Sequence, residues 1–203
     1  EAFNSTDETG ATTMPTISFV YRFNNLCNFK CRMCGDMLSS SWEAESRKHK
    51  TWSQESQPWM ASPLREQIIK FQDTQVVQEF VEAIEKKTIK EIYWCGGEPL
   101  MWDMHWKAMQ RIIELGFAKE VYVRYNTNLS RTSFKGIKLF DLLPQFQDWQ
   151  ICSSLDGTGE VGEYIRDGLD YEQWLRNFKE GMAVAKTSRE MRLDYTITMP
   201  GLL

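Results

Sequence analysis

The hydrophobic and polar positions of the chain follow two periods, one typical of buried strands and one typical of amphipathic helices. Short apolar or β-branched runs predict five strands, at residues 16–25, 90–95, 120–126, 149–155 and 192–199. Longer segments with one apolar face predict helices at residues 74–87, 103–116, 132–143 and 171–186. The polar segment 39–73 carries three tryptophans and predicts a helix followed by an irregular insertion. Residues 1–15 are expected to form a polar N-terminal tail.

The order of these elements predicts the fold class. Strand, helix and next strand, joined by connections of this length, pair in parallel through right-handed crossovers. Five such strands in series fit an α/β protein with either a barrel or a doubly wound sheet. Asp103 is expected to cap the start of its helix, and Gly116 to end it. In both architectures, functional side chains gather at the carboxyl ends of the strands.

Each of the first four predicted strands is followed by ligand-type or glycine residues. The first is followed by NLCNFKCRMCGD (25–36), in which three cysteines are spaced C-x3-C-x2-C. The next three are followed by GGEP (96–99), NTNL (126–129) and SLDG (154–157). Because parallel strands end at one rim, we expect these four segments to lie on the same side of the protein.

The cysteine loop is the strongest candidate for a metal centre. Three thiolates on one tight loop can bind iron or zinc, although a zinc site or an ordinary cluster has four protein ligands. The candidates for a fourth zinc ligand are His49, His105, Cys95 and Cys152, and none has zinc-finger spacing. The spacing therefore favours an iron–sulfur cluster with one open iron over zinc or three unrelated core cysteines. Cys95 and Cys152 lie in apolar runs and are expected to be inert core residues.

Composition and charge narrow the class of protein further. The 203 residues include 42% hydrophobic and 26% charged residues, which is ordinary for one globular domain. The net charge of -4 argues against a nucleic-acid binder held by electrostatics. The sequence has no apolar run near the roughly 20 residues that span a bilayer, and its start lacks the apolar region of a signal peptide. Five cysteines, three of them in one loop, indicate a reducing setting and hence a cytoplasmic protein.

The cysteine loop after the first strand and GGEP after the second together resemble the radical S-adenosylmethionine superfamily. The resemblance covers residues 16–200, and YNTNL, SLDG and YIRDG (164–168) make it most similar to the branch with twitch or SPASM extensions. It implies a partial TIM-like barrel with five of an expected six strands visible. The expected core domain is 16–203, truncated before a C-terminal extension.

The resemblance also implies an activity. In this family, three cysteines hold a four-iron, four-sulfur cluster, and S-adenosylmethionine chelates the fourth iron. Reductive cleavage of that cofactor gives methionine and a 5′-deoxyadenosyl radical, which abstracts hydrogen from substrate. The implied partners are a peptide or small-molecule substrate and an electron donor such as flavodoxin or ferredoxin, with neither a membrane nor a nucleic acid expected. A nucleotide, sugar or other metabolite as substrate, an iron–sulfur sensor and a degenerate cofactor-binding module remain as alternatives.

The same resemblance assigns roles to individual residues. The cluster ligands are Cys27, Cys31 and Cys34. The implied cofactor contacts are Met33, Gly96, Gly97, Glu98, Pro99, Asn128, Ser154, Asp156 and Arg166. Met33 stands where the family usually has an aromatic residue beside the adenine.

Simpler structural roles are open for several of these residues. GGEP matches the segment that meets the methionine amino group, where glycine permits close backbone approach; a plain turn would explain its glycines and proline but not its glutamate. Asn128 is expected near the ribose, or as a turn cap. Ser154 is expected near the cofactor carboxylate or ribose. Arg166 is expected to bind the carboxylate in two-pronged fashion, or to be exposed. Asp156 also fits a simple turn.

Overall fold

The computed structural model describes residues 2–22 and 24–202, and its centre is one parallel sheet. The sheet order is β1-β3-β4-β7-β9, and all neighbouring strands are parallel. These strands are β1 (Ser18–Tyr21), β3 (Glu91–Trp94), β4 (Tyr122–Thr127), β7 (Asp148–Ser154) and β9 (Met191–Asp194). Because each strand lies beside the next in sequence, the sheet winds in one direction, as in a barrel. This confirms the α/β class with five parallel strands and selects the barrel-like order over the doubly wound one.

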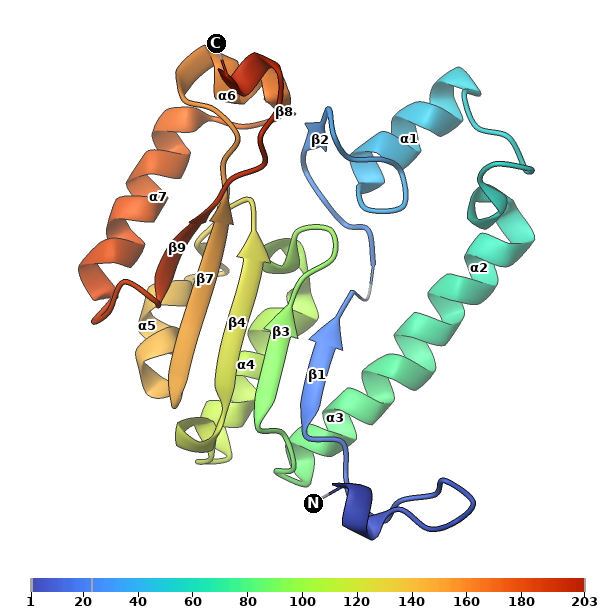
Figure 1. Cartoon of the computed structure of the whole chain (residues 1–203), viewed down its shortest axis with the longest axis vertical. Helices are drawn as coiled ribbons and strands as arrows, with labels where there is room; N and C mark the ends of the chain where they lie inside the picture. Colours follow the sequence, from blue (N-terminus) through green and yellow to red (C-terminus); the bar gives the residue numbers. More distant parts are fainter. Residues whose placement is uncertain (1, 23, 203) are drawn as a thin grey trace.

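Helices pack on one face of the sheet, and Figure 1 shows α4 and α5 behind the strands, with α7 beside β9 and α3 beside β1 at the two edges. They are α3 (Val77–Glu85), α4 (Asp103–Glu114), α5 (Leu139–Leu142) and α7 (Tyr171–Val184). Alternate strand residues, such as Ile92, Val123 and Ile151, are fully buried in the core against this layer. The strand residues between them are only partly buried and point to the opposite face, which is turned toward the viewer in Figure 1. The sheet therefore has one apolar, helix-covered face and one open face.

The segment expected to be irregular contains a second helix. After α1 (Ser40–His49) and a short turn, η2 (Pro58–Met60), the chain forms α2 (Ser62–Phe71). A single π turn, η3 (Gln72–Val76), joins α2 to α3, so the helix runs without a break from residue 62 to residue 85. The expected helix and irregular stretch are present at residues 40–57, but the expectation was wrong for residues 62–73, because the helical spacing of Leu64, Ile68 and Phe71 is hidden among polar residues.

Three other boundaries differ from expectation. Residues 133–138 form a hairpin of β5 (Ser133–Phe134) and β6 (Ile137–Lys138), whose turn residues Lys135 and Gly136 have φ of 49° and 84°. The helix α5 begins only after this hairpin, and η6 (Leu143–Gln145) follows it. The last strand ends at Asp194 rather than residue 199, since the Thr196 N–H is bonded to Asp156 instead of a neighbouring strand. Trp102, not Asp103, is the N-cap of α4, whereas Gly116, at a φ of 77°, follows its end as expected.

The remaining elements are short. Near the rim, β2 (Lys30–Cys31) pairs antiparallel with β8 (Arg166–Asp167), which follows α6 (Gly159–Ile165). The other turns are η1 (Ala2–Ser5), η4 (Pro99–Met101), η5 (Ala118–Glu120) and η7 (Pro200–Leu202). The N-terminal segment projects from the bottom of the molecule in Figure 1. Among the described residues, no helix is long and apolar enough to cross a membrane.

Candidate cofactor site

The cysteine loop lies at the carboxyl ends of the strands, between β1 and α1 (Figure 1). Its central part is held by the loop that follows β7, because Cys31 pairs with Arg166 and the Arg32 N–H donates to the Ile165 carbonyl at 2.9 Å. Contacts described below connect it to the segments after β3 and β4. The structure therefore brings the four predicted segments together on one rim.

The three loop cysteines differ in exposure. Cys31 is buried, Cys27 is half-buried and Cys34 is exposed. Burial raises the pKa of the Cys27 thiol to about 11. A hydrogen bond between Cys31 and Cys34 lowers the pKa of Cys34 and raises that of Cys31, whose burial adds to the increase. Arg166 acts in the opposite direction on Cys31, because its positive charge favours the thiolate.

Gly97 makes the closest approach of two backbone segments in the site. A Cβ at this position would lie 2.3 Å from the Leu26 carbonyl oxygen, so only glycine fits there. The next residue strengthens the contact, since the Glu98 N–H donates to the same carbonyl at 2.6 Å. Gly96 has a φ of 114°, which also favours glycine. The glycines of GGEP thus fit the cysteine loop against the end of β3.

Glu98 fastens the ends of β3 and β4 to each other. Its side chain is buried, and its Oε1 accepts hydrogen bonds from the Leu100 N–H at 3.0 Å and the Thr127 hydroxyl at 2.7 Å. Its Oε2 accepts from the Asn128 N–H at 2.6 Å. Burial raises the pKa of the Glu98 carboxyl to about 7, although these three donors oppose the increase. The Glu98 carboxyl group is therefore engaged within the protein.

Asn128 lies beside the first cysteine. Its Nδ2 is 3.9 Å from Cys27 Sγ and donates to Asn28 Oδ1 at 3.1 Å. Its Oδ1 accepts from the Ser130 N–H at 3.0 Å, so it also caps the turn after β4. The structure thus shows the turn-capping role, with the amide nitrogen beside Cys27.

Asp156 and Arg166 form a buried ion pair at the same rim. Arg166 Nε lies 2.6 Å from Asp156 Oδ2, without the alignment of a hydrogen bond, and the Asp156 side chain is fully buried. The Arg166 Nη1 reaches Cys31 Sγ at 3.8 Å. Asp156 is therefore more than a turn residue, and Arg166 is not solvent-exposed. The pair holds the Arg166 guanidinium next to the cysteine loop.

The other candidate residues are more peripheral or belong to the core. Met33 is exposed, and Ser154 is half-buried at the end of β7. Cys95 and Cys152 are half-buried rather than core residues. His105 is fully buried in α4, where its Nε2 contacts the Tyr125 hydroxyl at 2.9 Å, and burial lowers its pKa to about 3. His105 therefore belongs to the core rather than to the cysteine loop.

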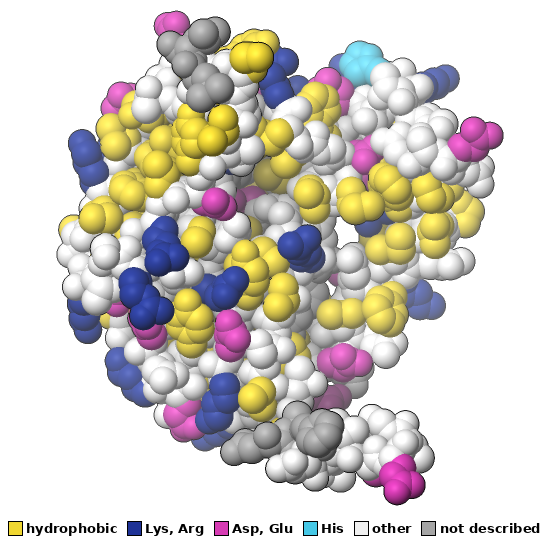
Figure 2. Space-filling model, viewed as in Figure 1, with side chains coloured by type: hydrophobic (Ala, Val, Ile, Leu, Met, Phe, Trp, Pro, Cys, Tyr) yellow, Lys and Arg dark blue, Asp and Glu magenta, His cyan; other side chains and the backbone are white. Residues whose placement is uncertain are grey.

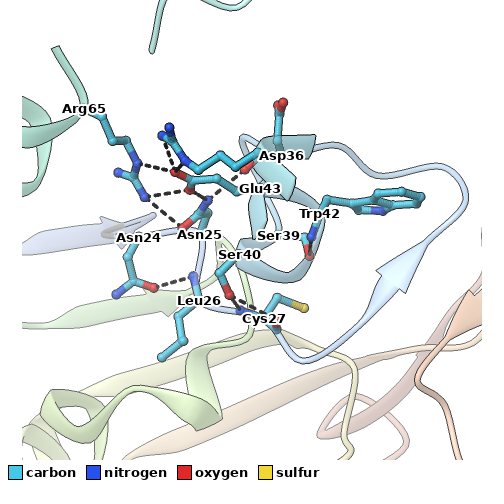
Figure 3. A network of polar contacts seen from close by, with 11 residues as sticks. Asn24, Asn25, Leu26, Cys27, Asp36, Ser39, Ser40, Trp42, Glu43 and Arg65 are labelled. Carbon is cyan, nitrogen blue, oxygen red and sulfur yellow. Dashed lines mark hydrogen bonds and ion pairs between the residues drawn. The ribbon is translucent and has the colours of Figure 1, made fainter. Parts of the chain in front are cut away.

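The first turn of α1 holds the cysteine loop through side chains that the sequence did not single out. Figure 3 shows Ser40 and Trp42 close to the loop. Ser40 Oγ accepts from the Cys27 N–H at 3.1 Å, and Ser41 Oγ donates to the Cys27 carbonyl at 2.8 Å. Ser39 donates to the Phe29 carbonyl at 2.6 Å, and the Trp42 indole donates to the Cys31 carbonyl at 2.9 Å. The run of serines could have signalled a helix start, but not these contacts.

Two adjoining cavities run along α2 toward the loop. The larger, of about 510 Å³, lies between β1 and α2 and is mainly apolar, with Val20, Ile68 and Phe71 in its wall. The smaller, of about 270 Å³, continues to Gly96 and the two ends of the cysteine loop. Figure 2 shows the hollow between the body of the molecule and the arm on its right.

The family model for the radical SAM superfamily matches residues 21–201. The chain belongs to the radical SAM superfamily. A comparison with curated proteins gives no match.

Solved structures of two proteins are similar to this radical SAM chain. The crystal structures of Streptococcus suis SuiB, alone and bound to S-adenosylmethionine, are each 12% identical with a TM-score of 0.48, and cover 92% of this chain. The chain spans about a third of SuiB, 34% of its length. TYW1 with a lysine-pyruvate adduct is 14% identical with a TM-score of 0.36, over 81% of this chain and 49% of TYW1. The family assignment rests on the family model.

The radical SAM family implies an iron–sulfur cluster, and the donors at the rim suit one. Three free thiols share one loop, with the Arg166 guanidinium beside Cys31 and the Asn128 amide beside Cys27. Such donors stabilise thiolates and tune the metal they hold. Within residues 2–22 and 24–202, no three His, Cys, Asp or Glu side chains converge as a single ion requires. A four-iron cluster does not require its three cysteines to converge on one point, because each cysteine binds a different iron.

Proposed function

We propose that this chain is the core of a radical SAM enzyme with its cluster on Cys27, Cys31 and Cys34. One observation carries the proposal: a chain of this superfamily places the cysteine loop, the GGEP backbone and the Arg166–Asp156 pair at one rim. When bound, the reduced cluster supplies the electron that cleaves S-adenosylmethionine to methionine and the 5′-deoxyadenosyl radical that takes hydrogen from substrate. The protein positions the cofactor and excludes side reactions.

Different residues of the rim bind the cluster and the cofactor in this proposal. The three cysteines hold the cluster, and the positive charge of Arg166 favours the thiolate form of Cys31 and Cys34. The backbone of residues 96–99 faces the methionine amino group, while the buried Glu98 carboxylate keeps that segment in place. Asn128 and Ser154 bind the ribose or carboxylate of the cofactor, Met33 packs near the adenine, and the Arg166–Asp156 pair orients the cofactor carboxylate.

We further propose that the substrate is polar and binds over the open face of the sheet. A chain of contacts crosses this face: the Tyr93 hydroxyl donates to Asn126 at 2.9 Å, and Asn126 donates to Asp194 at 3.1 Å. The Arg124 guanidinium lies 4.0 Å from the centre of the Tyr93 ring. These polar groups suit a peptide, which is one of the substrate classes of the twitch and SPASM branch that the motifs resemble. A nucleotide, a sugar or another small metabolite is the alternative.

The remaining parts of the proposal concern the cellular setting. Motifs typical of the twitch and SPASM branch support a longer native protein with a C-terminal extension. Five free cysteines support a reducing compartment, the cytoplasm. The electron would come from a donor such as flavodoxin or ferredoxin.

The proposal is tested by anaerobic reconstitution of the cluster, followed by dithionite and S-adenosylmethionine. We expect 5′-deoxyadenosine and methionine, and we expect Cys31→Ala to lose bound iron while Cys152→Ala keeps it. A protein with full iron and sulfide that forms no 5′-deoxyadenosine would instead be a sensor or a degenerate binding module. A colourless protein that binds zinc would refute the assignment of an iron–sulfur cluster to the three cysteines.

A further inference from the structure

The cysteine loop packs on the hydrophobic core through Phe29 and Cys31 and pairs with β8, whereas α1 has no buried residue of its own. Neither α1 nor α2 contains a fully buried residue. The first turn of α1 fixes the loop to α1, and the middle of the loop is fixed to the rest of the protein through β8. The helix α3, in contrast, buries Phe80, Ala83 and Ile84, and α2 continues directly into it. A link between α2 and the two ends of the loop would therefore add a second connection to the core, away from β8.

Three side chains and one backbone carbonyl make this link, and we name the four residues Asn25, Asp36, Glu43 and Arg65 the loop clasp (Figure 3). Asn25 and Asp36 stand at the two ends of the cysteine loop, and the Asn25 Nδ2 donates to the Asp36 carbonyl at 2.8 Å. The same amide donates to Glu43 Oε2 on α1 at 2.6 Å. The clasp thus closes the loop at its base and joins it to α1.

Arg65 joins the clasp to α2. Its Nε lies 3.1 Å from Glu43 Oε1, and its Nη2 lies 3.0 Å from Glu43 Oε2, which is a two-pronged pair. Its Nη2 also donates to Asn25 Oδ1 at 3.1 Å. The side chains of Glu43 and Arg65 are 13% and 19% exposed, so the pair is largely shielded from solvent.

The charges around Glu43 agree with this role. Arg47 on α1 adds a second guanidinium, with Nη2 at 2.8 Å from Glu43 Oε1. Burial alone would raise the pKa of Glu43, but hydrogen bonds from Arg65, Asn25 and Arg47 lower it to about 2. Removing one member of such a shielded network leaves its partners without hydrogen bonds, which costs more than an exposed pair contributes.

We propose that Glu43 and Arg65 are positioning residues that hold the cysteine loop in its ligand-binding conformation before any cluster is present. They act through Asn25 and Asp36, which fix the two ends of the loop. The identity of the group that the loop receives rests on the proposed function, but the restraint on the loop does not. A pre-arranged loop needs less ordering when the cluster assembles, and it releases the cluster more slowly.

The chain contains its own reporters for the test. Alkylation of each cysteine by iodoacetamide is followed by mass spectrometry in the metal-free full chain, for the wild type, Glu43→Gln and Arg65→Lys. We expect Cys27 and Cys31 to react about tenfold faster or more in Glu43→Gln. Cys95 and Cys152, outside the loop, should react at their wild-type rates. Arg65→Lys keeps the positive charge but loses the two-pronged contact with Glu43. The reaction rates of Cys27 and Cys31 in this variant should therefore lie between those of the wild type and Glu43→Gln.

A matched control is the pair of Arg111 and Glu85 between α4 and α3. It has the same two-pronged geometry, at 2.7 and 2.8 Å, but lies outside the clasp. Glu85→Gln should leave the reactivity of Cys27 and Cys31 unchanged. In reconstituted protein, Glu43→Gln should also release iron to a chelator roughly 10- to 100-fold faster than Glu85→Gln.

Three results would overturn the proposal. One is equal reactivity of Cys27 and Cys31 in the wild type, Glu43→Gln and Arg65→Lys. Another is equal acceleration at all five cysteines, which would show a global loss of structure. The third is the same acceleration in Glu85→Gln. A failure of the proposed function has a different signature, since the wild type would then form no 5′-deoxyadenosine while the alkylation pattern of the metal-free chain would stand.

Discussion

Glu98 offers a sharp test of the electrostatics of this site. The side chain is 2% exposed, and burial raises the pKa of its carboxyl to about 7 from an ordinary value of 4.5. Each pKa unit corresponds to about 1.4 kcal/mol, so this difference is worth about 3 kcal/mol. Between pH 4.5 and about 7, the folded protein keeps a proton on Glu98 that the unfolded chain has lost. The contribution to stability is therefore fully present below pH 4.5 and disappears as the pH rises through 7.

The perturbation is Glu98→Gln, which removes this titration. At low pH, the variant should be less stable by about 1–3 kcal/mol, because the Asn128 N–H loses its carboxyl acceptor. The deficit should shrink as the pH rises, by up to about 3 kcal/mol, since only the wild type loses stability through Glu98. The assay is urea denaturation of both metal-free chains between pH 4.5 and 8.5, in which other titrating groups cancel.

Thr127→Val provides a directional control. The Thr127 hydroxyl donates to Glu98 at 2.7 Å and so favours the ionised carboxylate. Its loss should raise the pKa of Glu98 further and move the pH-dependent window upward. A stability difference between the wild type and Glu98→Gln that stays constant from pH 4.5 to 8.5 would refute the reasoning, because Glu98 would then be ionised in the folded protein throughout.

Two further predictions concern packing. Gly97→Ala should destabilise the protein by about 1–3 kcal/mol or more and increase the alkylation of Cys27, because the new Cβ would lie 2.3 Å from the Leu26 carbonyl oxygen. Gly35→Ala in the same loop has no atom within 4 Å of its new Cβ and should change neither quantity appreciably; equal effects would contradict the close-approach argument. Phe80→Ala should lower the free energy of unfolding by about 3–5 kcal/mol in urea titration, since Phe80 is fully buried. Val81→Ala, one residue further on α3 and 36% exposed, should cost far less; a similar loss would place the core elsewhere.

The sequence located the strands well because strand signals are local. Apolar and β-branched runs mark β1, β3, β4 and β7 to within a few residues, and their order determines which strands are neighbours. Local signals failed where a distant partner decides the backbone. The last strand ends at Asp194 because the Thr196 N–H bonds to Asp156, forty residues earlier in the chain. The segment 133–138 turns at Lys135 and Gly136 into a hairpin, although its pattern also suits a helix.

The same division holds at the site. The sequence alone shows that three cysteines share one loop and that ligand-type residues follow the neighbouring strands. Because parallel strands end on one rim, it also predicts that these segments lie together. Only the tertiary structure showed that Glu98 turns into the protein and that Arg166 pairs with Asp156 beside Cys31. The loop clasp was also invisible in the sequence, because Glu43 lies 18 residues from Asn25 and 22 from Arg65, with no periodic pattern between them. Hydrogen bonds between such distant residues depend on how the helices pack, and that packing is decided only when the chain folds.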